Sequence, residues 1–217
     1  MKTILCYGDS NTWGCRDDGP RRYGLPERWP GILQAKLGAD YHVVEEGLPG
    51  RTTVLDDPYE DWKNGLSYLR PCLDSHNPDI VLLLLGTNDL KRRFGLSAWD
   101  IAQGAAKLVR TILAASATLD GRPPEVCLLA PPPVLEIGPY ATMFQGASAK
   151  SRELPAMYRQ VAEELGVPFV DASAIVSPSP TEGLHWRQTE HVKLGEAMAD
   201  FVLRACAARQ SQAGKGA

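Results

Sequence analysis

The run "DIVLLLLG" occupies residues 79–86 and is the most hydrophobic stretch of the sequence. Its apolar residues follow one another without alternating with polar ones, which is typical of a strand buried on both faces of a parallel sheet. The polar residues "TNDL" come directly after it, at 87–90. Ligands of such sheets bind at the carboxyl ends of the strands. We therefore expect a ligand site among the residues that directly follow runs of this kind.

Four further runs have the same length and character: "TILCYG" at 3–8, "YHVVEE" at 41–46, "EVCLLAP" at 125–131 and "VPFVDA" at 167–172. Segments with helical spacing lie between and after these runs. In one of them Leu154, Met157, Val161 and Leu165 fall on one helix face. Strand–helix alternation along the whole chain predicts an α/β fold, with a flavodoxin-like doubly wound sheet of five parallel strands and helices on both faces.

The composition is that of an ordinary globular domain, with 44% hydrophobic and 23% charged residues. The length of 217 residues suits one α/β domain. We expect this domain to span residues 1–208, followed by a frayed tail at 209–217. A net charge of −3 lacks the basic excess of a nucleic-acid-binding protein. No apolar run approaches the roughly 20 residues that cross a bilayer, and the N-terminal run is too short for a signal peptide. These features predict a cytoplasmic protein without a nucleic-acid or membrane partner.

Ser10 belongs to the segment "YGDSNTWG" at 7–14, which follows the first predicted strand. A serine at this edge of the sheet can direct its hydroxyl into a cleft. Taken alone, the segment is better explained as a polar turn or a helix N-cap, since Gly, Asp, Ser and Asn all favour turns. It has neither the Gly-x-Ser-x-Gly pattern of α/β-hydrolases nor the pattern of a phosphate-binding loop.

Gly50 and Asn88 follow the second and third predicted strands, in "EEGLPGRTT" and "LGTNDL". A glycine permits close backbone approach, so the Gly50 amide can point at a ligand oxygen. The Asn88 side chain can donate a hydrogen bond into the same cleft. Each segment by itself is equally explained as a loop or an Asx turn.

The segment "EGLHWRQTEH" at 182–191 contains two histidines and two glutamates. Glu182-x-x-His185 suits either a metal site or one half of a hydrolytic triad, in which His185 accepts a proton from a serine and Glu182 holds its other ring nitrogen. A metal needs further ligands, and His42 and His76 have no ligand spacing in the sequence. His191 is expected at the surface or at its boundary. The five cysteines, an odd number without close spacing, favour neither a disulfide framework nor a zinc knuckle.

Together these four segments place a serine, a glycine amide, an asparagine amide and a Glu-x-x-His pair at strand ends, in the order that a serine hydrolase needs. In this interpretation Ser10 attacks an ester carbonyl and His185 accepts its proton. The amides of Ser10 and Gly50 and the side chain of Asn88 stabilise the oxyanion. The sequence therefore predicts an esterase without metal or cofactor.

The same segments, Gly8-Asp9-Ser10, the Gly50 block, Gly86 to Asp89 and the His185 block, resemble in order the four blocks of the SGNH/GDSL hydrolase family. The segments "GDSNTWG", "EEGLPGRTT" and "LGTNDLK" resemble those of the arylesterase and acyltransferase branch of that family. The resemblance implies the SGNH hydrolase fold and a small intracellular homo-oligomer that cleaves short acyl esters. It also implies acyl transfer to alcohols or peroxide as a side activity.

Carried over to this chain, the resemblance makes Ser10 the nucleophile and His185 the base. Family members usually have Asp where this chain has Glu182, so the carboxylate must reach His185 from a longer side chain. Asp9 is expected to tie the nucleophile turn together and, with Trp13 and Pro133, to border the substrate pocket.

Two long loops are expected to shape the site. Residues 131–150 are expected to cover the site or form an oligomer contact, with apolar surface from four residues: Ile137, Tyr140, Met143 and Phe144. Residues 15–29 are expected mainly to expose charges to water.

The leading hypothesis is a serine esterase for short-chain, acetyl-type esters. The nearest alternative is a carbohydrate deacetylase of the same family, acting on acetyl-xylan or acetylated sugars. A noncatalytic flavodoxin-like binding module would not need a histidine held by a carboxylate. Metal-dependent hydrolysis through the Glu/His cluster would be favoured by metal in the purified protein.

Overall fold

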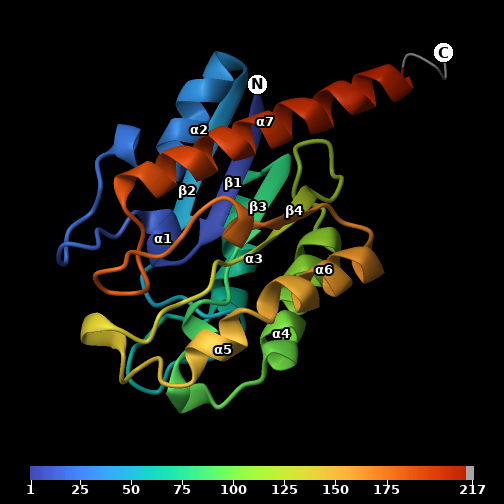
Figure 1. Cartoon of the computed structure of the whole chain (residues 1–217). Helices are drawn as coiled ribbons and strands as arrows, with labels where there is room; N and C mark the ends of the chain where they lie inside the picture. Colours follow the sequence, from blue (N-terminus) through green and yellow to red (C-terminus); the bar gives the residue numbers. More distant parts are fainter. Residues whose placement is uncertain (214–217) are drawn as a thin grey trace.

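A computed structural model describes residues 1–213, and the side chains of residues 1–205 (Figure 1). Five strands form one sheet: β1 Lys2–Gly8, β2 Tyr41–Gly47, β3 Ile80–Leu84, β4 Glu125–Ala130 and β5 Phe169–Asp171. All neighbouring strands are parallel, and their order is β2-β1-β3-β4-β5. This is the flavodoxin-like order, so the predicted fold class is confirmed.

The α-helices are α1 Ser10–Trp13, α2 Trp29–Leu37, α3 Gly65–His76, α4 Ala98–Leu113, α5 Ala147–Ser151, α6 Leu154–Leu165 and α7 Gln188–Ala213. Short 3₁₀ turns are η1 Leu25–Glu27, η2 Gly38–Asp40, η3 Asn88–Leu90, η4 Arg92–Phe94, η5 Gly138–Tyr140 and η6 Ala172–Ala174. Helices α2 and α7 cover one face of the sheet, and α3, α4 and α6 cover the other (Figure 1).

Successive strand residues belong to different cores. In β3, Val81 and Leu83 pack against the core under α3, α4 and α6, whereas Leu82 and Leu84 pack against the core under α2 and α7. Because side chains alternate across a strand, a strand covered on both faces needs apolar residues at every position. This explains the unbroken apolar run that predicts it.

The strand register aligns the ends of β2, β1 and β3. Gly8 at the end of β1 pairs with Gly47 of β2 on one side and with Leu84 of β3 on the other. The segments that follow these strands therefore leave the sheet at the same level. They form one edge, where Ser10, Gly50 and Asn88 lie.

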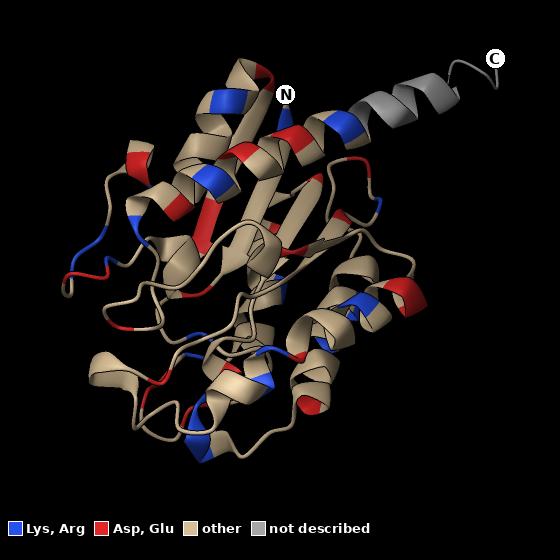
Figure 2. Cartoon of the chain, in the orientation of Figure 1, with Lys and Arg blue, Asp and Glu red and all other residues tan. Residues whose placement is uncertain are grey.

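The C-terminal helix α7 includes residues 209–213, which fall within the predicted tail, and residues 214–217 lie outside the described part of the chain. Among the residues described, no helix is both long and apolar enough to cross a membrane. Acidic and basic residues are interspersed along the helices and loops in the view of Figure 2 rather than gathered by sign.

Candidate active site

Ser10 is the first residue of α1, and a cap fixes the turn that carries it. Asp9 is the N-cap, and its carboxylate accepts a hydrogen bond from the backbone N–H of Asn11 at 3.0 Å. Asp9 is buried, and burial raises its pKa while the Asn11 bond opposes that rise. Asp9 thus ties the turn together, as predicted, and Ser10 stands at the carboxyl edge of the sheet.

His185 lies between Ser10 and Glu182, as the sequence predicts. Its Nε2 atom is 3.1 Å from the Ser10 Oγ atom, and its Nδ1 atom is 2.8 Å from a Glu182 carboxylate oxygen. A carboxylate only accepts hydrogen bonds, so Nδ1 donates to Glu182, and in the neutral imidazole Nε2 is left to accept the Ser10 proton. All three side chains are nearly buried. The arrangement has the connectivity of a hydrolytic triad.

The loop around Glu182 accommodates its longer side chain. The second carboxylate oxygen accepts hydrogen bonds from the backbone N–H groups of Leu184, at 3.0 Å, and His185. Gly183 adopts a φ of +80°, and a Cβ there would lie 2.3 Å from the Leu135 carbonyl oxygen. Glycine is therefore required at the position where the chain wraps the carboxylate.

The environment of His185 favours its charged form. Burial by itself lowers the pKa of the imidazole, but hydrogen bonding and electrostatic interaction with Cys15 and Glu182 raise it to about 9. The ring of Tyr140 packs edge-on against the imidazole, with centroids 5.5 Å apart. These contacts thus stabilise the charged form of the imidazole.

Gly50 and Asn88 lie on adjacent loops beside Ser10. The Asn88 side-chain amide donates to the Arg51 carbonyl at 3.1 Å, and Gly50 has a φ of +84°, which favours glycine. The next residue, Asp89, accepts hydrogen bonds from the Thr53 backbone N–H and hydroxyl, although burial raises its pKa to about 6. These bonds fasten the Gly50 loop to the loop of Asn88.

A cavity of about 200 Å³ opens at Ser10 and His185. Its lining comprises Ser10, Cys15, Pro49, Gly50, Glu60, Lys63, Asn88, Lys91, Tyr140, Met143, Phe144, Leu184 and His185. This volume is below the range of pockets for drug-sized ligands, about 300–1,000 Å³. The site therefore fits a small group next to the Ser10 hydroxyl.

A model of the GDSL-like lipase/acylhydrolase family matches residues 6–197. The chain belongs to this family. The predicted resemblance to this family is confirmed.

Two solved structures are similar to this protein over nearly the whole chain. The aryl esterase of M. smegmatis is 40% identical with a TM-score of 0.89, and the match covers 94% of this chain and 99% of that one. Est24, a carbohydrate acetylesterase from Sinorhizobium meliloti, is 39% identical with a TM-score of 0.89, over 94% of this chain and 100% of that one.

Two curated relatives match over part of their own length. The acetylxylan esterase of Xylanibacter ruminicola is 25% identical over 92% of this chain and 42% of the relative. The arylesterase of Vibrio mimicus is 35% identical over 42% of this chain and 40% of the relative. This chain thus spans less than half the length of these curated relatives.

Three residues were predicted to border the pocket, and all three lie outside the lining of this cavity: Asp9, Trp13 and Pro133. Trp13 is half-buried and packs under the guanidinium of Arg22, 4.9 Å from the ring centroid. Pro133 is half-buried in the loop that follows β4.

The predicted cover from the loop of residues 131–150 is present. Tyr140, Met143 and Phe144 line the cavity, whereas Ile137 does not. The loop of residues 15–29 exposes charges such as Asp18 and Arg21, as expected, but it also supplies Cys15 to the lining.

The sequence reasoning missed the charged residues in the lining of this cavity, Glu60, Lys63 and Lys91. Lys91 is buried and its ammonium contacts Asp57 at 3.0 Å and Glu60 at 3.2 Å, and Arg93 contacts the same two carboxylates. The sequence contains a signal for these charges: "LKRR" follows "GTND" directly. Residues that follow a strand-end segment lie near the same edge of the sheet, so basic side chains could have been expected at the site.

The expectation that His191 is a surface or boundary residue is wrong. Its side chain is fully buried at the start of α7, with ring centroids 5.2 Å from Tyr23 and 5.4 Å from Trp186. Burial, with the nearby charges of His185 and Arg28, lowers its pKa to about 3. His191 therefore packs as a neutral aromatic residue.

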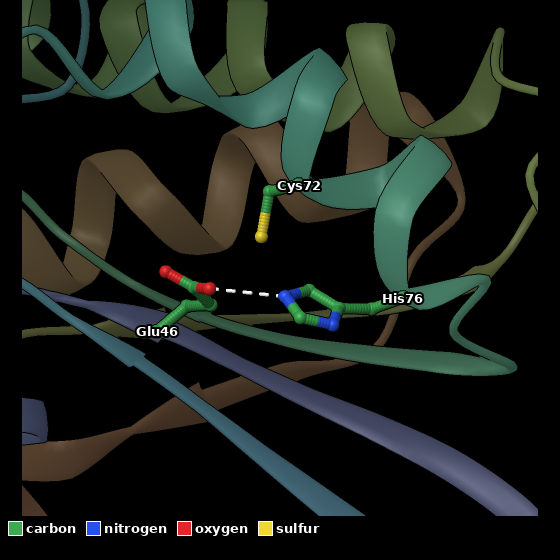
Figure 3. Close-up of side chains that lie close together, drawn as sticks. All are labelled: Glu46, Cys72 and His76. Atoms are coloured by element: carbon green, nitrogen blue, oxygen red, sulfur yellow. Dashed lines mark hydrogen bonds and ion pairs between the residues drawn. The ribbon is translucent and has the colours of Figure 1, made fainter.

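His76 also lies in a setting that the sequence argument did not foresee. It meets Cys72 and Glu46, and these three form a group of side chains able to hold a metal ion (Figure 3). The group lies outside the cavity lining at Ser10. The spacing of four residues between Cys72 and His76 within a helix was a signal that these two side chains lie together. Glu46 comes from β2, and no pattern in the sequence relates it to them.

Proposed function

We propose that the protein is a serine esterase that hydrolyses short-chain, acetyl-type esters, with Ser10 as the nucleophile. The observation that carries this proposal is the chain of contacts from Ser10 Oγ to His185 Nε2, at 3.1 Å, and from His185 Nδ1 to Glu182, at 2.8 Å. Membership of an acylhydrolase family supports it independently.

In the first half-reaction Ser10 Oγ attacks the ester carbonyl carbon while its proton passes to His185 Nε2. The carbonyl π electrons move to oxygen and give a tetrahedral oxyanion. When the oxyanion collapses, the bond to the leaving alkoxide breaks and His185 returns the proton to it. The alcohol leaves, and Ser10 carries the acyl group as an ester.

In the second half-reaction a water molecule replaces the alcohol. His185 takes a proton from the water, whose oxygen attacks the acyl carbon, and the second tetrahedral intermediate collapses. The Ser10 oxygen leaves and receives the proton from His185. The carboxylic acid is released and Ser10 is regenerated, so the cycle needs no cofactor.

The oxyanion is proposed to bind the backbone N–H groups of Ser10 and Gly50 and the side-chain amide of Asn88. The Asn88 amide has two N–H bonds, and one of them is already directed to the Arg51 carbonyl. That bond orients the amide plane before substrate arrives, and the second N–H is available to the oxyanion. A donor held in place in this way contributes about 3–4 kcal/mol to transition-state stabilisation.

Glu182 is proposed to hold the tautomer and the orientation of His185. Its bonds to two backbone N–H groups fix the carboxylate, and the fixed carboxylate fixes the ring. This is the role of the third triad member in serine hydrolases, in which either Asp or Glu serves.

The small cavity favours a short acyl group, and Tyr140, Met143 and Phe144 provide apolar walls. Similarity to an aryl esterase and to a carbohydrate acetylesterase supports two classes of leaving group, a phenol or a sugar hydroxyl. A carbohydrate deacetylase is thus the second candidate. Acyl transfer to alcohols or peroxide, a homo-oligomeric assembly and a cytoplasmic location stay predictions.

The test is a series of p-nitrophenyl esters with acyl chains of increasing length, run beside acetylated xylose. We expect kcat/KM to be highest for acetate and to fall steeply as the acyl chain outgrows the cavity. A higher value for long chains would contradict the short-acyl proposal. Faster deacetylation of the sugar than of the phenyl ester would favour the carbohydrate deacetylase.

A further inference from the structure

Glu46, Cys72 and His76 direct ligand atoms toward one another (Figure 3). Glu46 Oε1 lies 3.0 Å from His76 Nε2, and one ligand atom from each residue lies within 4.8 Å of the other two. Cys72 is buried, and Glu46 and His76 are partly exposed. The group combines a thiol, an imidazole and a carboxylate.

The fold explains why these three side chains converge. Cys72 and His76 are one helical turn apart in α3 and therefore lie on the same helix face. Glu46 pairs in register with Tyr7 of β1, and Tyr7 belongs to the core that packs beneath α3. Residues in register on neighbouring strands point to the same face of the sheet, so Glu46 points toward α3.

We propose that Glu46, Cys72 and His76 bind a thiophilic divalent cation, for which Zn²⁺ is the best match. Zinc takes Cys, His and carboxylate ligands in tetrahedral geometry at about 2.0–2.3 Å. Ligand atoms held in that way are roughly 3.3–3.8 Å apart, by the geometry of a tetrahedron with these bond lengths. The observed separations bracket this range, since Glu46 Oε1 and His76 Nε2 are 3.0 Å apart and all three ligand atoms lie within 4.8 Å of one another.

The charges around the group are compatible with the ion. On binding, the Cys72 thiol releases its proton to solvent and its sulfur lone pair bonds to the metal. A thiolate and a carboxylate then neutralise the two charges of Zn²⁺. Arg51, whose guanidinium lies 4.0 Å from the other Glu46 oxygen, therefore faces a complex of no net charge.

The group can be reached from solvent, and its three ligands leave one coordination position free for exchange of the metal ion or its water. A cavity of about 600 Å³ reaches Glu46 and is lined in addition by Arg51, Trp62 and Tyr68. The His76 side chain is 30% exposed. Three protein ligands leave a fourth tetrahedral position for water. Solvent reaches the group at Glu46, which lines this cavity, and at the exposed part of His76.

Cobalt(II) is the probe for the test, because a Co²⁺–thiolate bond gives a charge-transfer band in the near ultraviolet and a tetrahedral site gives visible d–d bands. The full chain without a histidine tag is titrated with CoCl₂, and Zn²⁺ is then added in competition. We expect one Co²⁺ per chain with both sets of bands, and their loss when Zn²⁺ displaces it.

The variants Cys72→Ala and His76→Gln are titrated in the same way, with Cys15→Ser as the matched cysteine control. We expect Cys72→Ala to lose the charge-transfer band. We expect His76→Gln to bind Co²⁺ at least about tenfold more weakly, because it removes a metal ligand. Cys15→Ser should bind like wild type. His76 is partly exposed, so its variant tests the site even where Cys72→Ala folds poorly.

No thiolate band in the wild-type chain would overturn the proposal. Bands that persist in both Cys72→Ala and His76→Gln would also overturn it, as would their loss in Cys15→Ser. These outcomes are independent of ester hydrolysis, because the readout is optical and the group lies outside the cavity at Ser10.

Discussion

The carboxylate of Glu182 lies 2.8 Å from Nδ1 of His185, and its other oxygen accepts hydrogen bonds from the backbone N–H groups of Leu184 and His185. One side chain therefore orients the imidazole and closes the loop that carries it. The extra methylene of Glu, compared with the usual Asp of the family, is accommodated by the wrap of the loop at Gly183.

Replacing Glu182 by Gln should reduce kcat by about 10²–10⁴-fold with little change in the fold. The neutral amide can donate to Nδ1 and so favour the wrong tautomer of His185, and it cannot stabilise the imidazolium. Glu182→Asp keeps the charge and should retain more activity than Glu182→Gln. Steady-state kinetics with p-nitrophenyl acetate measures both, and equal rates for Glu182→Gln and wild type would remove Glu182 from the mechanism.

The pH dependence of kcat/KM should show an acid limb above the ordinary histidine pKa of about 6.5. Burial lowers the pKa of His185, but Cys15 and Glu182 raise it to about 9. The base must be neutral, so activity should rise as pH passes upward through this value. Glu182→Gln removes a negative charge and should move the limb to lower pH. Initial rates across the pH range, corrected for spontaneous hydrolysis, give the pKa of this limb. A wild-type limb with a pKa at or below about 6.5 would contradict the raised pKa of His185.

Asn88→Ala should lower kcat by about 10²–10³-fold while KM changes little, because an oxyanion donor acts mainly in the transition state. The matched control is Asn77→Gly, which changes an asparagine outside the cavity at a φ of +44° that suits glycine. Its kinetics should match those of wild type. A loss confined to KM in Asn88→Ala would show that Asn88 binds substrate without stabilising the oxyanion.

His191 should make the folded state sensitive to acid. Its folded pKa is lowered to about 3, so between about pH 6.5 and 3 only the unfolded chain binds this proton. Stability from this group is therefore present above 6.5 and lost as pH falls, at about 1.4 kcal/mol per pH unit.

His191→Leu removes that contribution. Between pH 7 and pH 5 the wild type should lose about 2 kcal/mol more unfolding free energy than the variant. Urea unfolding at both pH values measures the difference, with the exposed His42→Gln as the control. Equal pH dependence in wild type and His191→Leu would contradict the buried, neutral assignment.

The sheet and the core of the site were predictable because both depend on local patterns. A strand such as residues 80–84 is covered on both faces, so its apolar run is unbroken. Parallel strands end at one edge, so Ser10, Gly50 and Asn88 meet there. The spacing of Glu182 and His185 is short enough to predict their contact.

The features that the sequence reasoning missed depend on contacts between distant segments. His191 has a helix-start position typical of a surface residue, but α7 packs it against Tyr23 and Trp186. Glu46 is thirty residues from His76, and only the register of β2 under α3 brings them together. Periodicity within one element carries no information about such pairs.

The central claim is that Ser10 is the nucleophile, and the most direct measurement is p-nitrophenyl acetate hydrolysis by wild type and Ser10→Ala, each with and without EDTA. Circular dichroism shows whether both chains are folded alike. We predict activity that is unaffected by EDTA and lost in folded Ser10→Ala. Activity that persists in Ser10→Ala but disappears with EDTA would contradict the account and assign the chemistry to a metal.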